Sequence, residues 1–127
     1  MLTKFKAYGT QAALSLLLAA DIGGTSVILE VAPLRIRAGQ AQAFENSFRE
    51  AQRIISSMPG YVSHELQRCL ERTDEYILLV RWASVDARET GFRGSPQYQE
   101  WKALLHHFYD PFPTVLHFEA VPGTTSL

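Results

Sequence analysis

The sequence has almost no cysteine, and this scarcity excludes two kinds of site. Among 127 residues there is one cysteine, Cys69, so neither an internal disulfide nor a cysteine-rich zinc site can form. Excess charge of one sign is also missing, because 12 basic residues stand against 13 acidic ones. The sequence therefore offers no general electrostatic basis for binding nucleic acid or an anionic membrane.

The sequence also lacks a hydrophobic run long enough to cross a bilayer, which takes about 20 apolar residues. The apolar run at 12–20 is shorter, and it follows Lys4 and Lys6 in a segment, 1–26, that differs from the rest. A positive start before an apolar stretch has the outline of a secretory signal. The alternatives are an extra amphipathic helix or an extension from an upstream start codon. We expect a cytoplasmic protein, whereas a working signal would imply a secreted or periplasmic one.

The remaining composition is typical of one globular domain. Hydrophobic residues make up 46% of the chain and aromatic residues 11%, which argues against disorder. We expect an N-terminal extension over 1–26, a domain over 27–121 and a tail over 122–127.

Hydrophobic periodicity predicts the elements of this domain. Apolar and β-branched residues predict a strand at 27–37, and a stripe with helical spacing predicts a helix over 40–58 that ends at Pro59-Gly60. Two further strands are predicted at 61–70 and 76–82. In the first of them, strict alternation puts Val62 and His64 on one face and Tyr61 on the other.

The second half of the domain begins with a short helix predicted over 85–90, with Ser84 as its N-cap. Ser95-Pro96 predicts the start of a longer helix, whose apolar stripe is Tyr98, Trp101, Leu105 and Phe108. A last strand is predicted at 115–121.

The resulting order, β-α-β-β-α-β, predicts the ferredoxin-like split βαβ arrangement within the α+β class. Right-handed crossovers place both helices on one face of a four-stranded antiparallel sheet, which leaves the opposite face bare. A second copy is the simplest cover for that face, so we expect a homodimer paired sheet to sheet, a dimeric α/β barrel.

Five stretches in this order resemble the antibiotic biosynthesis monooxygenase (ABM) family of the dimeric α/β-barrel superfamily. They are RIRAG at 35–39, the helix with Phe44 and Phe48, MPGY at 58–61, YILLVRWAS at 76–84, and FRGSPQYQEWKALLHHFYDPFPTV at 92–115. The resemblance spans about 28–118 and leaves 1–26 outside it.

The resemblance implies an oxidoreductase that oxidises a small aromatic quinol or polyphenol with O₂, without flavin or metal. Such a reaction needs a substrate anion, a group that accepts its proton, and a pocket that excludes water. Fold alone does not settle the activity. Two alternatives stay open: a non-catalytic dimeric ligand-binding or stress-response domain, and a heme-binding protein with His106 or His107 as axial ligand.

Individual positions match the family unevenly. Trp82 matches a pocket tryptophan of the branch that oxidises aromatic polyketides, but Leu78 stands where that branch has asparagine. Arg88 replaces a tyrosine of that branch and a histidine of a quinol-oxidising branch, while Lys102 lies near a family arginine. In the heme-cleaving branch, Ala32 and Lys102 fall where asparagine and histidine are needed, which disfavours heme cleavage.

The candidate site has two groups of residues. A substrate pocket is expected from four aromatic side chains: Trp82, Phe92, Tyr98 and Trp101. Catalytic roles are expected for Arg88 and Lys102, which would stabilise the substrate anion, and for His64 or His106, which would take its proton. Lys102 and His106 are four residues apart and should share one helix face. The four histidines have no spacing typical of a metal site, so no metal is expected.

Overall fold

The computed structural model of the chain describes residues 27–127, and the predicted N-terminal segment 1–26 lies outside the described residues. The elements follow in the order β1 (Ile28–Arg35), α2 (Ala41–Ser56), β2 (Tyr61–Arg68), β3 (Glu75–Trp82), η1 (Ala87–Phe92), α3 (Pro96–Leu105), η2 (His106–Phe108) and β4 (Leu116–Glu119). No helix between residues 27 and 127 is both long and apolar enough to cross a membrane.

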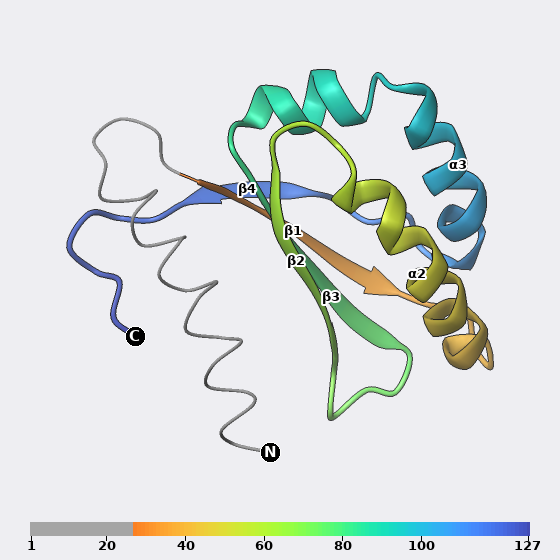
Figure 1. The fold of residues 1–127 in the computed structure, drawn as a ribbon. Coiled ribbons are helices and arrows are strands. Elements are labelled where there is room, and N and C mark those ends of the chain that lie inside the picture. The colour runs from red at the N-terminus through yellow and green to blue at the C-terminus, as the bar shows by residue number, and fades with distance from the viewer. Residues whose placement is uncertain (1–26) are drawn as a thin grey trace, which may run out of the picture.

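The four strands form one antiparallel sheet with the order β2-β3-β1-β4. Both helices lie on the same side of this sheet, and the two crossovers α2 and α3 pack against each other (Figure 1). The predicted ferredoxin-like arrangement is therefore confirmed, with β1 and β3 in the centre. The central position of β3 agrees with its residues, which are apolar on both faces except at Glu75 and Arg81.

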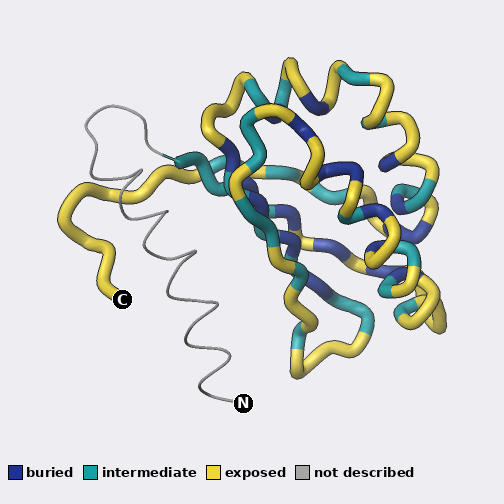
Figure 2. Tube along the Cα trace, viewed as in Figure 1, coloured by how far each residue is buried: buried dark blue, intermediate teal, exposed yellow. Residues whose placement is uncertain are grey.

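The core lies between the sheet and the helices. Along β3 the side chains alternate, so that Tyr76, Leu78, Val80 and Trp82 are buried under the helices while their neighbours face the other side. The predicted stripe on α2 is buried against them, with Phe44 and Ala51 fully enclosed. Figure 2 shows the same division, with buried residues along the inner sides of the helices and exposed residues outside.

Strand β2 departs from the strict alternation predicted for it. A β-bulge between Tyr61 and Ser63 shifts the register, so Tyr61 pairs with Trp82 and shares the helix-covered side with His64. The expectation that Tyr61 and His64 point to opposite faces was therefore wrong. The strand enters this bulge through Gly60, whose φ of +85° favours glycine, and an added Cβ there would lie 2.6 Å from Cβ of Ala87.

The short helix predicted over 85–90 is present, is mainly π-helical, and continues through Gly91 to Phe92. Ser84 does cap its start, since its Oγ accepts a hydrogen bond from Ala87 N at 3.0 Å. At the other end, Arg93 N donates to Arg88 O at 3.0 Å, five residues back. This closure brings Arg88 and Arg93 to the same side of the chain.

Candidate functional site

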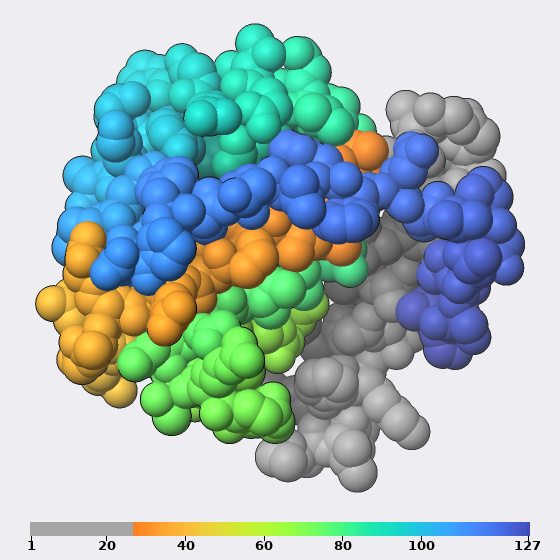
Figure 3. Space-filling model, turned by 180° about the vertical axis from the view of Figure 1, so that it is seen from behind, coloured from red at the N-terminus to blue at the C-terminus, as the bar shows by residue number. Residues whose placement is uncertain are grey.

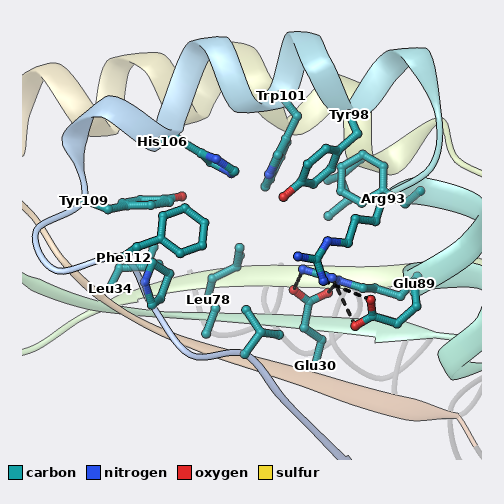
Figure 4. A pocket seen from close by; sticks show the side chains of 16 residues that line it. Glu30, Leu34, Leu78, Glu89, Arg93, Tyr98, Trp101, His106, Tyr109 and Phe112 are labelled. Atoms are coloured by element: carbon teal, nitrogen blue, oxygen red, sulfur yellow. Dashed lines mark hydrogen bonds and ion pairs between the residues drawn. The ribbon is translucent and has the colours of Figure 1, made fainter.

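A cavity of about 160 Å³ lies between α3 and the helix-covered face of the sheet. Its walls come from β1, α2, β3, η1, α3, η2 and the loop before β4, and Figure 4 shows the side chains that surround it. The apolar and aromatic lining residues are Ala32, Leu34, Ile55, Leu78, Phe92, Tyr98, Trp101, Tyr109, Phe112, Pro113 and Val115. The ionisable lining residues other than tyrosine are Glu30, Arg88, Glu89, Arg93 and His106.

The aromatic end of the cavity is built from α3 and the chain that follows it. Tyr98 and His106 contact each other edge to face at 5.7 Å between ring centroids, and Phe112 contacts the same imidazole at 4.9 Å. Trp101 packs against Phe92 at 5.6 Å with nearly perpendicular rings. Figure 4 shows the rings of Tyr98, Trp101, His106 and Phe112 facing the same space, with Leu78 below them. Such edge-to-face walls suit a flat aromatic ligand.

His106 carries a neutral imidazole at neutral pH. Partial burial, together with the positive charges of Lys102, Arg88 and Arg93, lowers its pKa to about 4. Its neighbour Tyr109 is buried, and desolvation raises the pKa of that phenol far above its usual value. The aromatic end therefore holds an uncharged ring nitrogen that can accept a proton, and an uncharged phenol beside it.

The opposite end of the cavity contains a buried ion pair between β1 and η1. Glu30 and Arg88 are 4% and 7% exposed, and Arg88 Nη2 donates to Glu30 Oε2 at 3.3 Å. Trp82 Nε1 donates to the other oxygen, Oε1, at 2.8 Å. Since a buried charge is costly unless it is paired and hydrogen-bonded, Glu30 holds both Trp82 and Arg88 in place.

Glu89 and Arg93 extend this pair toward the surface. Arg88 Nη1 donates to Glu89 Oε1 at 3.3 Å, and Arg93 Nη1 donates to Glu89 Oε2 at 3.2 Å. One carboxylate is thus held between two guanidinium groups. Two buried nitrogens nearby, Arg88 Nε and His117 Nε2, have no hydrogen-bond partner among residues 27–127. Arg88 Nε lies 3.2 Å from Glu30 Oε1, as an ion-pair contact without hydrogen-bond geometry.

Five of the eight predicted site residues line this cavity. They are Arg88, Phe92, Tyr98, Trp101 and His106. Trp82 is fully buried behind the lining, where it stacks on Phe92 at 5.7 Å between ring centroids. Trp82 therefore supports the cavity wall through Phe92 and Glu30.

The structure does not bring the remaining two predicted residues to the cavity. Lys102 is exposed on α3 and is not part of the lining, although its positive charge contributes to the lowered pKa of His106. His106 lies one turn beyond Lys102, because its backbone N–H donates to Lys102 O, but only the former of the two side chains lines the cavity. His107, adjacent to His106, is exposed.

His64 lies under α2, where both of its ring nitrogens are engaged within the fold. Its Nδ1 is 2.6 Å from the Tyr61 hydroxyl, and its Nε2 is 3.0 Å from Gln52 Oε1. The Gln52 amide nitrogen donates to Arg49 O, so its oxygen faces the imidazole and Nε2 carries the proton. Burial lowers the pKa of His64. This histidine has its hydrogen bonds satisfied away from the cavity.

Sequence reasoning missed Glu30, Glu89 and Arg93. Glu30 could have been noticed, because it is an acidic residue in register with the inward-facing Ala32 and Leu34 of a strand. Arg93 offered no such indication, since the preceding helix was expected to end at residue 90. Among the described residues, no group of three or more histidine, cysteine or acidic side chains is placed to hold a metal ion.

Comparison with known proteins places this architecture in a family. The family model for antibiotic biosynthesis monooxygenases matches residues 27–104, and the chain belongs to this family. YczJ of Bacillus subtilis (strain 168), itself uncharacterized, is 54% identical over 95 residues, which cover 75% of this chain and all of YczJ.

Solved structures agree on the fold. A candidate antibiotic biosynthesis monooxygenase from Bordetella bronchiseptica is 29% identical with a TM-score of 0.73, and the match covers 76% of this chain and 98% of that one. SnoaB of Streptomyces nogalater, a cofactor-independent oxygenase, has a TM-score of 0.62 at 20% identity, over 79% of this chain and 96% of that one. At that identity the SnoaB match shows the shared fold alone.

Proposed function

We propose that the protein is a monooxygenase that oxidises a small aromatic quinol or polyphenol with O₂ and needs no cofactor. The observation that carries the proposal is the cavity itself, which places a neutral imidazole at its aromatic end and guanidinium groups at the other. Membership of the monooxygenase family supports the same reaction class.

In the proposed reaction His106 accepts the proton of a substrate hydroxyl. The imidazole is uncharged at neutral pH and can therefore act as the acceptor. The positive groups that lower the pKa of His106 also favour a phenolate formed beside it. Arg88 and Arg93 supply this charge from the cavity wall. The electron-rich anion is the form that can pass electrons to O₂.

The atoms and electrons balance without any further reagent. A quinol loses its two hydroxyl hydrogens and one ring C–H is replaced by a carbon–oxygen bond, so a hydroxyquinone and water are formed from quinol and O₂. One oxygen atom enters the ring and the other leaves as water when the O–O bond breaks. The substrate supplies all four electrons that O₂ takes up. The residues of the cavity bind and orient the substrate, move its proton and exclude water.

We also propose that a second copy covers the open face of the sheet. That face presents apolar side chains from three strands, among them Leu29, Val31 and Leu79, and Leu116 and Phe118 of β4 are about half exposed. Figure 3, seen from behind, shows the C-terminal segment with the edge strand β4 running across the molecule next to β1. An apolar patch of this kind marks an interaction site. A monomer mass that stays constant over a hundredfold concentration range would overturn the dimer.

The experiment for the activity is O₂ uptake by metal-free protein, with chelator present, across quinols, catechols and anthrones. We expect a rate well above the autoxidation blank for at least one quinol or polyphenol. His106→Gln should lower that rate by about 100-fold or more, the usual contribution of a positioned proton acceptor. His107→Gln is the matched control, since His107 is adjacent but exposed. Blank rates across the panel would refute the proposal, and equal rates in wild type and His106→Gln would remove His106 from the mechanism.

The same assay distinguishes the contribution of an arginine at the cavity from that of a lysine outside it. Arg93 lines the cavity whereas Lys102 does not, so Arg93→Gln should reduce turnover more than Lys102→Ala does. The reverse order would support the role that the sequence predicted for Lys102.

A further inference from the structure

We propose that the substrate of this cavity is a single-ring aromatic compound that carries an acidic substituent, a carboxylate in the simplest case. The inference rests on the proposed function, whose substrate it narrows in size and in charge. The hydroxyl that reacts would lie at the His106 end, and the acidic group would lie at the end formed by Arg88 and Arg93.

The size of the cavity limits the number of rings. Its volume of about 160 Å³ is close to that of the apolar cavity of about 150 Å³ that takes up benzene in an engineered lysozyme. A single substituted ring therefore fills the space between Leu78 and the aromatic residues of α3. Three fused rings exceed it, and protein interiors do not expand readily to accept extra volume.

The charged end has more hydrogen-bond donors than acceptors. A guanidinium has five N–H donors, and among the described residues the side chain of Arg93 uses Nη1 alone, on Glu89. Arg88 is more than nine-tenths buried, and its Nε has no hydrogen-bond partner. A buried donor without a hydrogen-bond partner is rare, so Arg88 Nε and the further N–H groups of Arg93, both on residues of the cavity wall, point to a ligand rich in acceptor oxygens.

The fold already contains a carboxylate between the two arginines. Glu89 places one oxygen on Arg88 and the other on Arg93, and its side chain is about one-third exposed. This shows that the two guanidinium groups are spaced to share one carboxylate. Arg93 is more than half exposed. Its remaining N–H groups can therefore donate hydrogen bonds to the acidic group of a ligand without breaking the buried pair of Arg88 with Glu30.

Binding without oxygen tests this inference separately from catalysis. We would measure the affinities of 2,5-dihydroxybenzoate and 2,5-dihydroxybenzamide by anaerobic calorimetry, because the two probes have nearly the same shape and differ in charge. The acid should bind at least tenfold more tightly than the amide. Anthracene-2-carboxylate, with three fused rings, should bind at least tenfold more weakly than the single-ring acid.

Two variants test whether the charged end of the cavity causes the preference for the acid over the amide. Arg93→Gln should bring the acid-to-amide ratio close to one, whereas Arg72→Gln, an exposed arginine in the β2–β3 turn, should leave it unchanged. Equal affinity of acid and amide in the wild type, an unchanged ratio in Arg93→Gln, or tighter binding of the three-ring acid would each overturn the inference. Acid preference without O₂ uptake would refute the proposed function alone, while turnover of quinols without acid preference would refute the inference alone.

Discussion

Removing the carboxylate of Glu30 should destabilise the fold strongly, because it leaves a buried cation and a buried indole N–H without their acceptor. In the native protein Glu30 accepts hydrogen bonds from Trp82 at 2.8 Å and from Arg88 at 3.3 Å. All three residues are at most 7% exposed. Breaking such a pair from one side costs about 3–5 kcal/mol. We expect Glu30→Ala to lower the free energy of unfolding by about 3 kcal/mol, near the lower end of this range, because Glu89 still pairs with Arg88.

The measurement is urea-induced unfolding at one fixed protein concentration, since association would otherwise change the apparent stability. The matched control is Glu100→Ala, which removes an ion pair with Arg53 at 2.6 Å whose side chains are both more than half exposed. Exposed pairs contribute about 0–1 kcal/mol, so this variant should stay close to the wild type.

A double replacement shows whether the buried charge itself is the cause. Glu30→Leu combined with Arg88→Met removes both charges and fills the space with apolar atoms, which can be neutral or stabilising in other proteins. The double variant should therefore be more stable than Glu30→Ala. A cost below about 1 kcal/mol for Glu30→Ala, or a double variant that is no more stable, would refute the reasoning.

Three further predictions concern protonation and local structure. Because the pKa of His106 is lowered to about 4 in the fold, the unfolded chain takes up a proton that the folded state lacks between about pH 6.5 and 4. The free energy of unfolding should thus fall as the pH is lowered through this window, less steeply in His106→Gln, and the NMR signal of His106 should titrate below pH 5. Gly60→Ala should lower the midpoint of urea unfolding clearly more than Gly39→Ala does. Both positions have positive φ, but an added Cβ at Gly60 would lie 2.6 Å from Cβ of Ala87, whereas at Gly39 it has no contact within 4 Å. Ser95→Ala should cost about 1 kcal/mol in the same assay, since Ser95 caps the first turn of α3, and Ser95→Asp should retain the wild-type value.

The order of elements could be predicted from the sequence because it depends on local patterns. The buried stripe of α2 has helical spacing, and β3 is recognisable as a central strand by its apolar residues on both faces. The start of α3 follows from Ser95-Pro96, a cap and a preset φ angle that act within one turn. The aromatic wall followed from the same spacing, since Trp101 lies on the inner face of α3.

The charged end could not be predicted in this way, because it joins segments far apart in the chain. Glu30 and Arg88 are 58 residues apart, and the β1–β3 pairing and the position of η1 bring them together. The widened turn of η1 then adds Arg93, although the helix was expected to end before it, at residue 90.

The sequence by itself indicated the family through resemblance, and its local patterns determined which segments are strands and helices and, outside β2, which faces they bury. These properties depend on the spacing of apolar residues and on caps and turns, all of which act between near neighbours. The tertiary structure decided that His106 faces the cavity while Lys102 faces solvent, and that the hydrogen bonds of His64 are satisfied elsewhere. The physical reason is that the packing of whole elements sets a helix end, a bulge or a buried ion pair. Such packing cannot be predicted from a local sequence pattern.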